Sequence, residues 1–378
     1  MNILLATNGN LDCGGITLFM LQWLKGIKQA LPDSRVIVYF RESIENAEIA
    51  AEFKRHKVSI ITSEIPKGVN FKDRKANKKV RDDIKRIILN EKIDVLHINS
   101  RMYGFNVLLL SEAKKCGVSV RIAHAHGAIS EKLHDKIIHT FMKRRIRSLA
   151  TLYAGCSKTA GQHLFGKKGV TSSKWRFVPN TIQTERFAFD ETVRRRRRES
   201  LNVKDDEILL GAIGHLTEVK NHVFLIELLH DLRNRSIPAK LIIIGEGEKR
   251  DELQMRCKEY GIEDKVILYG ASSEVPEWLS ALDYYLMPSL SEGLPISAVE
   301  AQANGLVCLL SDRITREVDL TDNIYHLSIS SGVYPWAEMI ESTTPVSVAQ
   351  RLEGVSNVKN AGFDESDTSL YVKKIYIM

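Results

Sequence analysis

The sequence lacks the features that mark disulfide-rich, metal-binding, exported and membrane-spanning proteins. Its 378 residues include only five cysteines, and none of them are spaced as metal ligands or as a redox pair. We therefore expect free thiols in a reducing compartment. The first residues, MNILLATNGN, do not form a secretory signal, and no apolar run is long enough to span a membrane. The sequence predicts a cytoplasmic protein.

Two motifs of other enzyme classes are also absent. The loop after the first predicted strand contains Gly14 and Gly15 but no complete G-x-G-x-x-G, and no acidic residue stands where a nucleotide ribose would need one. An NAD-dependent enzyme is therefore disfavoured. No Asp-x-Asp follows a convincing predicted strand end, so we predict neither a metal site nor a cofactor.

The charge is distributed unevenly along the chain. Residues 1–180 carry a net charge of +17 and the remaining residues a net charge of −10, which together give the +7 of the whole chain. This asymmetry suggests that the N-terminal half faces an anionic membrane surface, a pyrophosphate-linked substrate or nucleic acid, although solvated Lys and Arg faces would also explain it. The chain has no nucleic-acid recognition motif or aromatic platform, so we predict no nucleic-acid partner.

Apolar runs and helical patterns alternate in both halves of the chain. A buried strand is predicted at 1–7, a helix at 16–31 and a strand at 35–40, which is the opening of an α/β domain. A second alternation begins at Ile208, and 378 residues comfortably form two domains. We therefore predict two doubly wound α/β domains with a cleft between them. Further strands are predicted at 58–62, 94–98, 119–125, 152–155, 176–180, 208–213, 240–245, 265–269, 284–288 and 307–311.

The segment 181–200 shows no strong strand signal and is predicted to be the interdomain linker. It contains the run Arg194–Arg198, which indicates either the exposed face of a short helix or a phosphate-binding cluster. The last 50 or so residues lack the α/β rhythm, and 364–377 is predicted as a closing helix.

The most informative segment is PSLSEGLPISAVEAQANG, residues 288–305. A predicted strand ends at Pro288, and Pro295 stands where the first residue of a helix is expected. The free N–H groups of such a helix can bind an anion. A phosphate would repel Glu292, so this carboxylate is better placed for sugar hydroxyls. Glu300 lies about 1.5 turns into the helix, where it can accept hydrogen bonds from ribose hydroxyls.

These residues resemble the paired-glutamate motif of GT-B glycosyltransferases of family four. The resemblance rests on Glu292 and Glu300 with EGLP and EAxAxG around them, and it extends over roughly residues 1–325. It implies a GT-B fold, in which two Rossmann-like domains face across a cleft. It also implies a donor site in the C-terminal domain that includes Gly293, Leu294 and Pro295.

Three further segments match the family. In GAIGHLTEVKN, residues 211–221, Lys220 matches the lysine that neutralises the leaving diphosphate, but His215 stands where the family has arginine. A neutral histidine brings no fixed charge, so His215 has either a phosphate-contacting or a structural role. In RIAHAHG, residues 121–127, the position at the strand end favours His126 over His124 as the residue that faces the donor sugar. Gly14 and Gly15 match the loop that abuts the donor.

The resemblance assigns roles to four parts of the chain. Residues 1–180 become an acceptor-side domain, 181–200 the linker and 201–358 the nucleotide-sugar domain, and 359–378 form a helix that returns to the N-terminal domain. His126, Lys220 and Glu292 are the expected catalytic residues. The implied activity is transfer of a sugar, with retention and without a metal, from a nucleotide-diphosphate sugar, for which we favour a UDP-sugar.

The acceptor is expected to be a glycan or a polyprenyl-pyrophosphate-linked sugar in surface-polysaccharide synthesis. Residues 131–150 combine an apolar face with many basic residues, which is typical either of a peripheral helix on anionic lipid or of an ordinary packed helix. Peripheral contact with the inner face of the membrane is therefore one expectation. Two alternatives remain open, namely a nucleotide-sugar epimerase of GT-B fold and a non-catalytic relative that binds nucleotide sugar or glycan.

Overall fold

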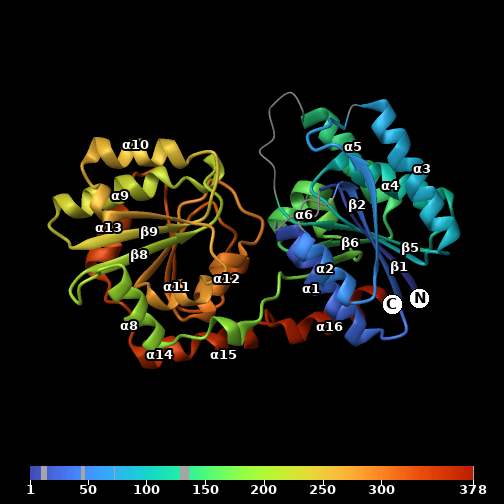
Figure 1. Ribbon diagram of the computed structural model, residues 1–378. Helices are drawn as coiled ribbons and strands as arrows, with labels where there is room; N and C mark the ends of the chain where they lie inside the picture. The colour runs from blue at the N-terminus through green and yellow to red at the C-terminus, as the bar shows by residue number, and fades with distance from the viewer. Residues whose placement is uncertain (10–14, 44–46, 72, 128–135, 378) are drawn as a thin grey trace. The chain divides into compact units, whose positions relative to one another are not determined.

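The computed structural model describes residues 1–9, 15–43, 47–71, 73–127 and 136–377 (Figure 1). Gly14 and Cys13 lie outside these described residues. The chain forms two compact units: Met1–Thr181 together with Glu365–Met378, and Ile182–Asp364. Among the described residues, no helix is both long and apolar enough to cross a bilayer. The four described cysteines are free thiols, as predicted.

The first unit is built on a parallel sheet of seven strands. Its strands are β1 (Asn2–Thr7), β2 (Arg35–Glu42), β3 (Ser59–Ile65), β4 (Val95–Asn99), β5 (Val120–Ala125), β6 (Leu152–Gly155) and β7 (Trp175–Phe177). Their spatial order is β3-β2-β1-β4-β5-β6-β7, and every pairing is parallel. The order reverses between β1 and β4, where Thr7 pairs with Asn99 at the carboxyl ends. Such a switch point is where ligands bind in doubly wound sheets.

Helices cover both faces of this sheet because its strands are apolar on both sides. One face packs against α1, α2 and α16 around Trp23, Leu24 and Ile375, and the other face carries the remaining helices of the unit. The helices are α1 (Gly15–Ala30), α2 (Ala47–Arg55), α3 (Arg74–Asn90), α4 (Tyr103–Lys115), α5 (Lys136–Leu149), α6 (Lys158–Phe165), α7 (Lys167–Val170) and α16 (Thr368–Tyr376).

The second unit repeats the same design with six parallel strands. They are β8 (Ile208–Ile213), β9 (Ala239–Ile244), β10 (Val266–Gly270), β11 (Tyr284–Met287), β12 (Val307–Ser311) and β13 (Ile324–Leu327). The spatial order is β10-β9-β8-β11-β12-β13, so the switch point lies between β8 and β11. The two doubly wound α/β sheets confirm the predicted fold class. Strand β13 was not predicted, because its four residues are only half buried and give a weak apolar signal.

Helices also cover both faces of the second sheet. One face packs against α9, α10 and α13 around Phe224, Leu253 and Trp336. Helix α13 lies in a stretch rich in Ser, Thr and Pro that gave no clear pattern in the sequence. The helices are α8 (Glu191–Ser200), α9 (Val223–Asn234), α10 (Arg250–Tyr260), α11 (Val275–Ala281), α12 (Ile296–Ala303), α13 (Tyr334–Ser342), α14 (Val348–Leu352) and α15 (Gly354–Asn360).

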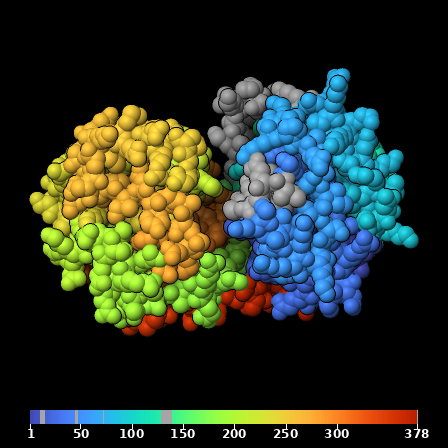
Figure 2. Space-filling view, in the orientation of Figure 1, coloured from blue at the N-terminus to red at the C-terminus, as the bar shows by residue number. Residues whose placement is uncertain are grey.

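The prediction of a linker at 181–200 is wrong. The second unit begins at Ile182, and α8 packs on α11 within it. Figure 2 shows the light-green residues of α8 continuing into the orange surface of the same unit. The five consecutive arginines had suggested an exposed segment, but several of them bond to the body of the unit.

The C-terminal boundary also differs from the prediction. Residues 359–364 belong to the second unit, and the chain returns to the first unit only from Glu365 onward. Helix α16 then packs against α1, where Gly26 permits close approach. A Cβ atom on Gly26 would lie 2.5 Å from Thr368 Cγ2 and 3.2 Å from the Thr368 carbonyl carbon.

Candidate functional site

The loop between β11 and α12 forms one wall of the candidate site in the second unit. Pro295 is the N-cap residue of α12 rather than its first helical residue, so the predicted position is corrected by one. No side chain caps this helix end, and its first turn carries no acidic residue. The N–H groups of the first turn are therefore available to an anion at the carboxyl edge of β11. Gly293 is half-buried here and Leu294 is buried.

Lys220 and Glu292 form an ion pair across this edge of the sheet. Lys220 Nζ lies 2.7 Å from Glu292 Oε1, and the two side chains are 21% and 15% exposed. Lys220 ends a short 3-10 helix, η3 (Glu218–Lys220), in the loop that follows β8. A backbone bond from Leu290 N to Val219 O, 2.8 Å long, joins the two loops. The structure thus brings together two predicted catalytic residues that are far apart in sequence.

Close backbone contacts hold the loop after β8 in place. Gly245, with φ of +150°, donates its N–H to Gly270, and a Cβ atom on it would lie 2.0 Å from the carbonyl oxygen of Gly214. The aliphatic part of Lys220 lies over Gly214, since a Cβ there would be 3.1 Å from Lys220 Cε. Glycine is therefore required where the loops after β8 and β9 meet.

Glu300 is a half-buried carboxylate on α12 without a counterion. Among the described residues, it has no hydrogen-bond or ion-pair partner for its side chain. Burial raises the pKa of Glu300 to about 7, although the Arg186 guanidinium acts in the opposite direction. Burial raises the pKa of Tyr285 well above its usual range, and Glu292 and Glu300 both add to the rise. The Tyr285 hydroxyl bonds to Ser297 Oγ at 2.8 Å. The two glutamates therefore share one neighbourhood, as the motif predicts.

His215 lies at the same edge but is exposed. Within the described part of the chain, its imidazole ring makes no hydrogen bond or ion pair. Its backbone carbonyl accepts from Thr217 N at 2.9 Å. Among the described residues, the ring therefore makes no polar contact that would indicate a structural role. Its exposed side chain is accessible to a ligand.

In the first unit, His126 stands at the carboxyl end of β5. Its Nε2 lies 2.9 Å from Asn99 Oδ1 at the end of β4, and its ring stacks on His124 with 4.2 Å between centroids. Burial lowers the pKa of His126 to about 3, with a further contribution from Arg101. His126 is therefore a neutral ring at the switch point. Gly15 is the exposed first residue of α1.

His124 is fully buried, and it belongs to a hydrogen-bonded chain that sequence reasoning missed. His124 Nδ1 lies 3.0 Å from His97 Nε2, and His97 Nδ1 lies 2.7 Å from the hydroxyl of Tyr376. Tyr376 is on the C-terminal helix, so no local pattern connects it with β4 or β5. The only available signal was polar residues within apolar strands.

Comparison with known proteins identifies the family of the chain. Residues 14–186 match the family model described as Glycosyltransferase Family 4, and residues 193–322 match the model Glycosyl transferases group 1. The Bacillus subtilis protein described as glycosyltransferase EpsF is 30% identical over 256 residues, which are 67% of each chain. The chain belongs to the group 1 glycosyltransferases.

Two further relatives of this glycosyltransferase are informative. The UDP-Gal:alpha-D-GlcNAc-diphosphoundecaprenol alpha-1,3-galactosyltransferase of Escherichia coli is 26% identical over 237 residues, 60% of each chain. The structure of HepE from Anabaena in complex with UDP matches with a TM-score of 0.76 and covers 99% of each chain at 15% identity. The two Rossmann-like domains are thus those of the GT-B fold.

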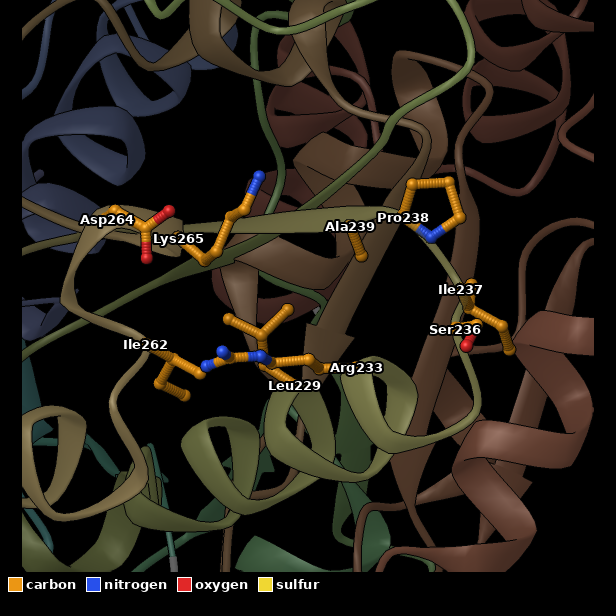
Figure 3. Close-up of a pocket in the computed structure, with 9 residues that line it drawn as sticks. All are labelled: Leu229, Arg233, Ser236, Ile237, Pro238, Ala239, Ile262, Asp264 and Lys265. Carbon is orange, nitrogen blue, oxygen red and sulfur yellow. The ribbon is translucent and has the colours of Figure 1, made fainter.

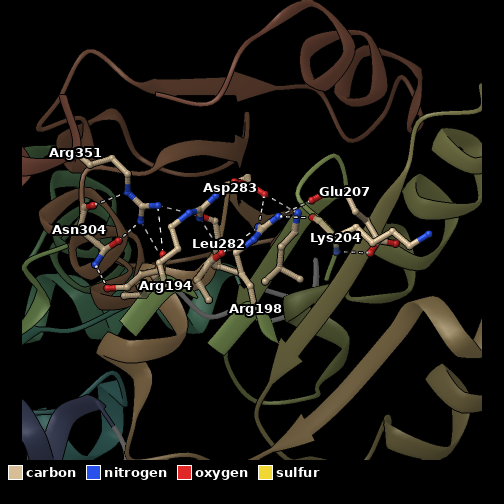
Figure 4. Close-up of polar contacts among 12 residues, drawn as sticks. Arg194, Arg198, Lys204, Glu207, Leu282, Asp283, Asn304 and Arg351 are labelled. Carbon is tan, nitrogen blue, oxygen red and sulfur yellow. Dashed lines mark hydrogen bonds and ion pairs between the residues drawn. The ribbon is translucent and has the colours of Figure 1, made fainter. Parts of the chain in front are cut away.

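The arginine run of this glycosyltransferase serves its fold. Arg194 Nη2 and Arg198 Nη1 bind the two oxygens of Asp283 (Figure 4). Arg197 binds Glu274 and Glu277. The same network continues to buried Arg351, which bonds to carbonyl groups at the end of α11. These arginines neutralise Asp283 and cap α11, so the run is not a phosphate cluster.

A pocket of 350 Å³ in the glycosyltransferase lies away from the predicted site. Its lining includes Arg233, Pro238 and Lys265, near the amino ends of β9 and β10 (Figure 3). Ligands of doubly wound sheets bind at the opposite, carboxyl ends of the strands. None of the predicted site residues line it.

Proposed function

We propose that this glycosyltransferase moves a sugar from a nucleotide-diphosphate sugar, which we take to be a UDP-sugar, to a polyprenyl-diphosphate-linked acceptor, with retention and without a metal. The observation that supports the donor site is the Lys220–Glu292 pair beside the uncapped N-terminus of α12. One cation, one set of N–H groups and two carboxylates suit a ligand with both phosphates and hydroxyls.

The diphosphate would be stabilised as it leaves. Lys220 Nζ and the first N–H groups of α12 offer positive charge at one edge of the sheet, and such preorganised groups act on charge as it develops. When a diphosphate draws Lys220 away, Glu292 is released to accept hydrogen bonds from the sugar. Glu300 would accept from the ribose hydroxyls, and His215 has an exposed ring that could donate to a phosphate oxygen.

This arrangement supplies positive charge without a metal. The chemistry would consist of leaving-group stabilisation and positioning. Retention then follows from attack by the acceptor on the face that the diphosphate leaves. Equal initial rates with EDTA and with added Mg²⁺ are expected, and a product anomer that matches the donor's would support retention. An inverted product, or a rate that EDTA abolishes, would contradict these two parts of the proposal.

The acceptor proposal rests on charge and on a relative. The first 180 residues carry a net charge of +17, and the galactosyltransferase relative acts on a diphosphoundecaprenol-linked sugar. Helix α5 buries Ile146 and Leu149 but leaves Phe141 60% exposed beside exposed Arg144 and Arg145. It therefore packs on its unit and still offers an apolar and basic strip to anionic lipid.

Flotation with anionic and neutral vesicles tests the membrane contact. Phe141→Ser should reduce binding to anionic vesicles several-fold, whereas Leu370→Ser, at an equally exposed apolar residue on α16, should not. Equal losses in both variants, or no vesicle binding by the wild type, would contradict the membrane part of the proposal alone.

The activity itself is tested by nucleoside diphosphate release. A panel of UDP-, GDP- and ADP-sugars would be assayed with and without a polyprenyl-diphosphate-linked sugar. Acceptor-stimulated release from one donor, lost in Glu292→Ala and retained in Lys249→Ala, is the expected result. Lys249 is a suitable control because it pairs with Glu218 and Glu252. Conversion of the donor alone would indicate an epimerase, and no binding of any nucleotide sugar would indicate a non-catalytic relative.

A further inference from the structure

A row of buried side chains in the first unit connects the C-terminal helix to the carboxyl end of β5. Trp23 Nε1 donates to the Tyr376 hydroxyl at 2.9 Å, Tyr376 bonds to His97 Nδ1 at 2.7 Å, and His97 Nε2 bonds to His124 Nδ1 at 3.0 Å. All four residues are at most 6% exposed. Apolar packing alone would not require three aligned polar groups in this core.

The hydrogen atoms in this row can be assigned from its two ends. The indole of Trp23 can only donate, so the Tyr376 oxygen accepts from it and its own O–H is available to His97 Nδ1. His97 is neutral, because burial lowers its pKa to about 3, and it then carries its proton on Nε2. That N–H donates to His124 Nδ1. His124 is neutral too, since burial holds its pKa well below the usual range, so its proton lies on Nε2.

The far end of the row is left open. His124 Nε2 is buried and has no hydrogen-bond partner among the residues that the structure describes. A buried donor without an acceptor costs about 1–3 kcal/mol, so the arrangement persists only because other contacts hold the ring. The His97 ring lies almost coplanar with that of His124, with 5.2 Å between centroids, as two rings joined edge to edge by this hydrogen bond do, and His126 stacks on the face of His124 at 4.2 Å. Phe19 packs edge-on at 4.8 Å.

We propose that Tyr376, His97 and His124 form a positioning relay for His126. The relay fixes His124 as the Nε2–H tautomer and fixes the plane of the ring on which His126 is stacked. His126 Nε2–H in turn donates to Asn99 Oδ1, which leaves its Nδ1 as the acceptor that a ligand hydroxyl would meet. The positioning of His126 at the end of β5 therefore depends on the docking of α16.

The relay would work without a change of charge. The two imidazoles of the relay and that of His126 are neighbours, and a proton on one lowers the proton affinity of the next, as His126 does for His97 and His124. The other charged group that faces the row is Arg101, which acts on His126 in the same direction. The relay thus holds neutral rings in fixed tautomers, and it is not a path for a net positive charge.

The tautomers can be measured by ¹⁵N NMR of the full-length protein labelled at histidine. The wild type should show His97 and His124 protonated on Nε2 and uncharged between about pH 5.5 and 8.5. Tyr376→Phe should leave neither ring with one fixed tautomer. Tyr39→Phe serves as the control, because Tyr39 is also buried in this unit but bonds to Ser63. A proton on His124 Nδ1 in the wild type, or unchanged spectra in Tyr376→Phe, would overturn the proposal.

A second pair of variants keeps the test decisive if Tyr376→Phe folds poorly. In His97→Gln the side-chain amide can still donate to His124 Nδ1, so the His124 tautomer should be retained. In His97→Leu it should be lost. The same His124 spectrum in both variants would overturn the relay.

The last measurement is of enzyme kinetics, and it rests on the proposed transferase function. Tyr376→Phe should lower kcat about threefold to tenfold, the equivalent of one hydrogen bond, with the donor KM within about twofold and Tyr39→Phe unchanged. Equal kcat in Tyr376→Phe and wild type would overturn the positioning role. Absence of turnover in the wild type would count against the transferase function instead, because the NMR result does not depend on it.

Discussion

Lys220 Nζ and Glu292 Oε1 lie 2.7 Å apart although 72 positions separate the residues in sequence. The loop after β8 carries the lysine and the loop after β11 the glutamate, and these strands are neighbours only because the strand order reverses between them. In the protein without ligand, each is the counterion of the other. Under the proposed function, a diphosphate competes with Glu292 for Lys220.

This competition predicts that substitutions at Lys220 and at Glu292 have opposite effects on nucleotide binding. Lys220→Ala should weaken binding of the nucleoside diphosphate by about tenfold or more, because a charge-assisted bond is lost. Glu292→Gln should bind the diphosphate as tightly as the wild type or up to a few-fold more tightly, yet turn over about 10²-fold more slowly. Isothermal titration and initial rates measure both. Weaker diphosphate binding in Glu292→Gln would show that the pair does not compete with ligand.

Glu300 gives the second prediction, which concerns pH. Its pKa is about 7 in the folded protein and near 4.5 when unfolded, so the folded state binds the extra proton between these values. Stability should therefore fall as pH rises from about 4.5 to 7, by an amount on the order of 1–3 kcal/mol. Glu300→Gln should remove that slope in urea unfolding.

Donor binding should show the reverse dependence on pH, because the ionised carboxylate is the better acceptor for ribose hydroxyls. Wild-type affinity should decline as pH drops below about 7. Glu300→Gln should bind more weakly and vary less with pH. Parallel pH profiles of the two proteins would exclude Glu300 from the ribose site.

Two glycines provide a third, paired prediction. Gly245→Ala should destabilise the second unit by about 1–3 kcal/mol or more, since its Cβ would meet the Gly214 carbonyl oxygen at 2.0 Å. Gly15→Ala should leave stability nearly unchanged, because its Cβ would meet no atom of the described residues within 4 Å. If the donor approaches α1, Gly15→Ala should still raise the donor KM. Thermal unfolding and kinetics separate these effects, and an unchanged KM in Gly15→Ala would remove Gly15 from the donor site.

The contact between α1 and α16 gives a fourth prediction. Gly26→Ala should destabilise the first unit by about 1–3 kcal/mol, because the new methyl would press on Thr368 and its backbone. The displacement should also disturb the His97 tautomer, through Tyr376 on the same helix. Gly117→Ala is a control for a glycine with open space around it, although its φ of +79° adds a backbone cost. If Gly26→Ala were as stable as the wild type, α16 would not pack against α1 as described.

Much of this fold was predictable because buried parallel strands are nearly continuous apolar runs. β1, β6, β8 and β12 fall within a residue of their predicted bounds for this reason. The paired glutamates were found through the family motif around them, and the structure has Glu292 in the loop before α12 and Glu300 on α12 itself. The errors concern segments where packing outweighs local pattern. The arginines of α8 look solvent-exposed in sequence, but Asp283 and Glu277 bind them.

The sequence by itself determined the two α/β alternations, the family and the residue types at each strand end. Local hydrophobic patterning carries that information, because burial acts on each strand and helix separately. Only the tertiary structure decided which of those residues meet. It paired Lys220 with Glu292, left Glu300 without an ion-pair partner among the described residues and joined Tyr376 to His97 and His124. These relations depend on strand order and on the docking of α16, which bring together side chains that are 27 to 279 positions apart and that no local pattern connects.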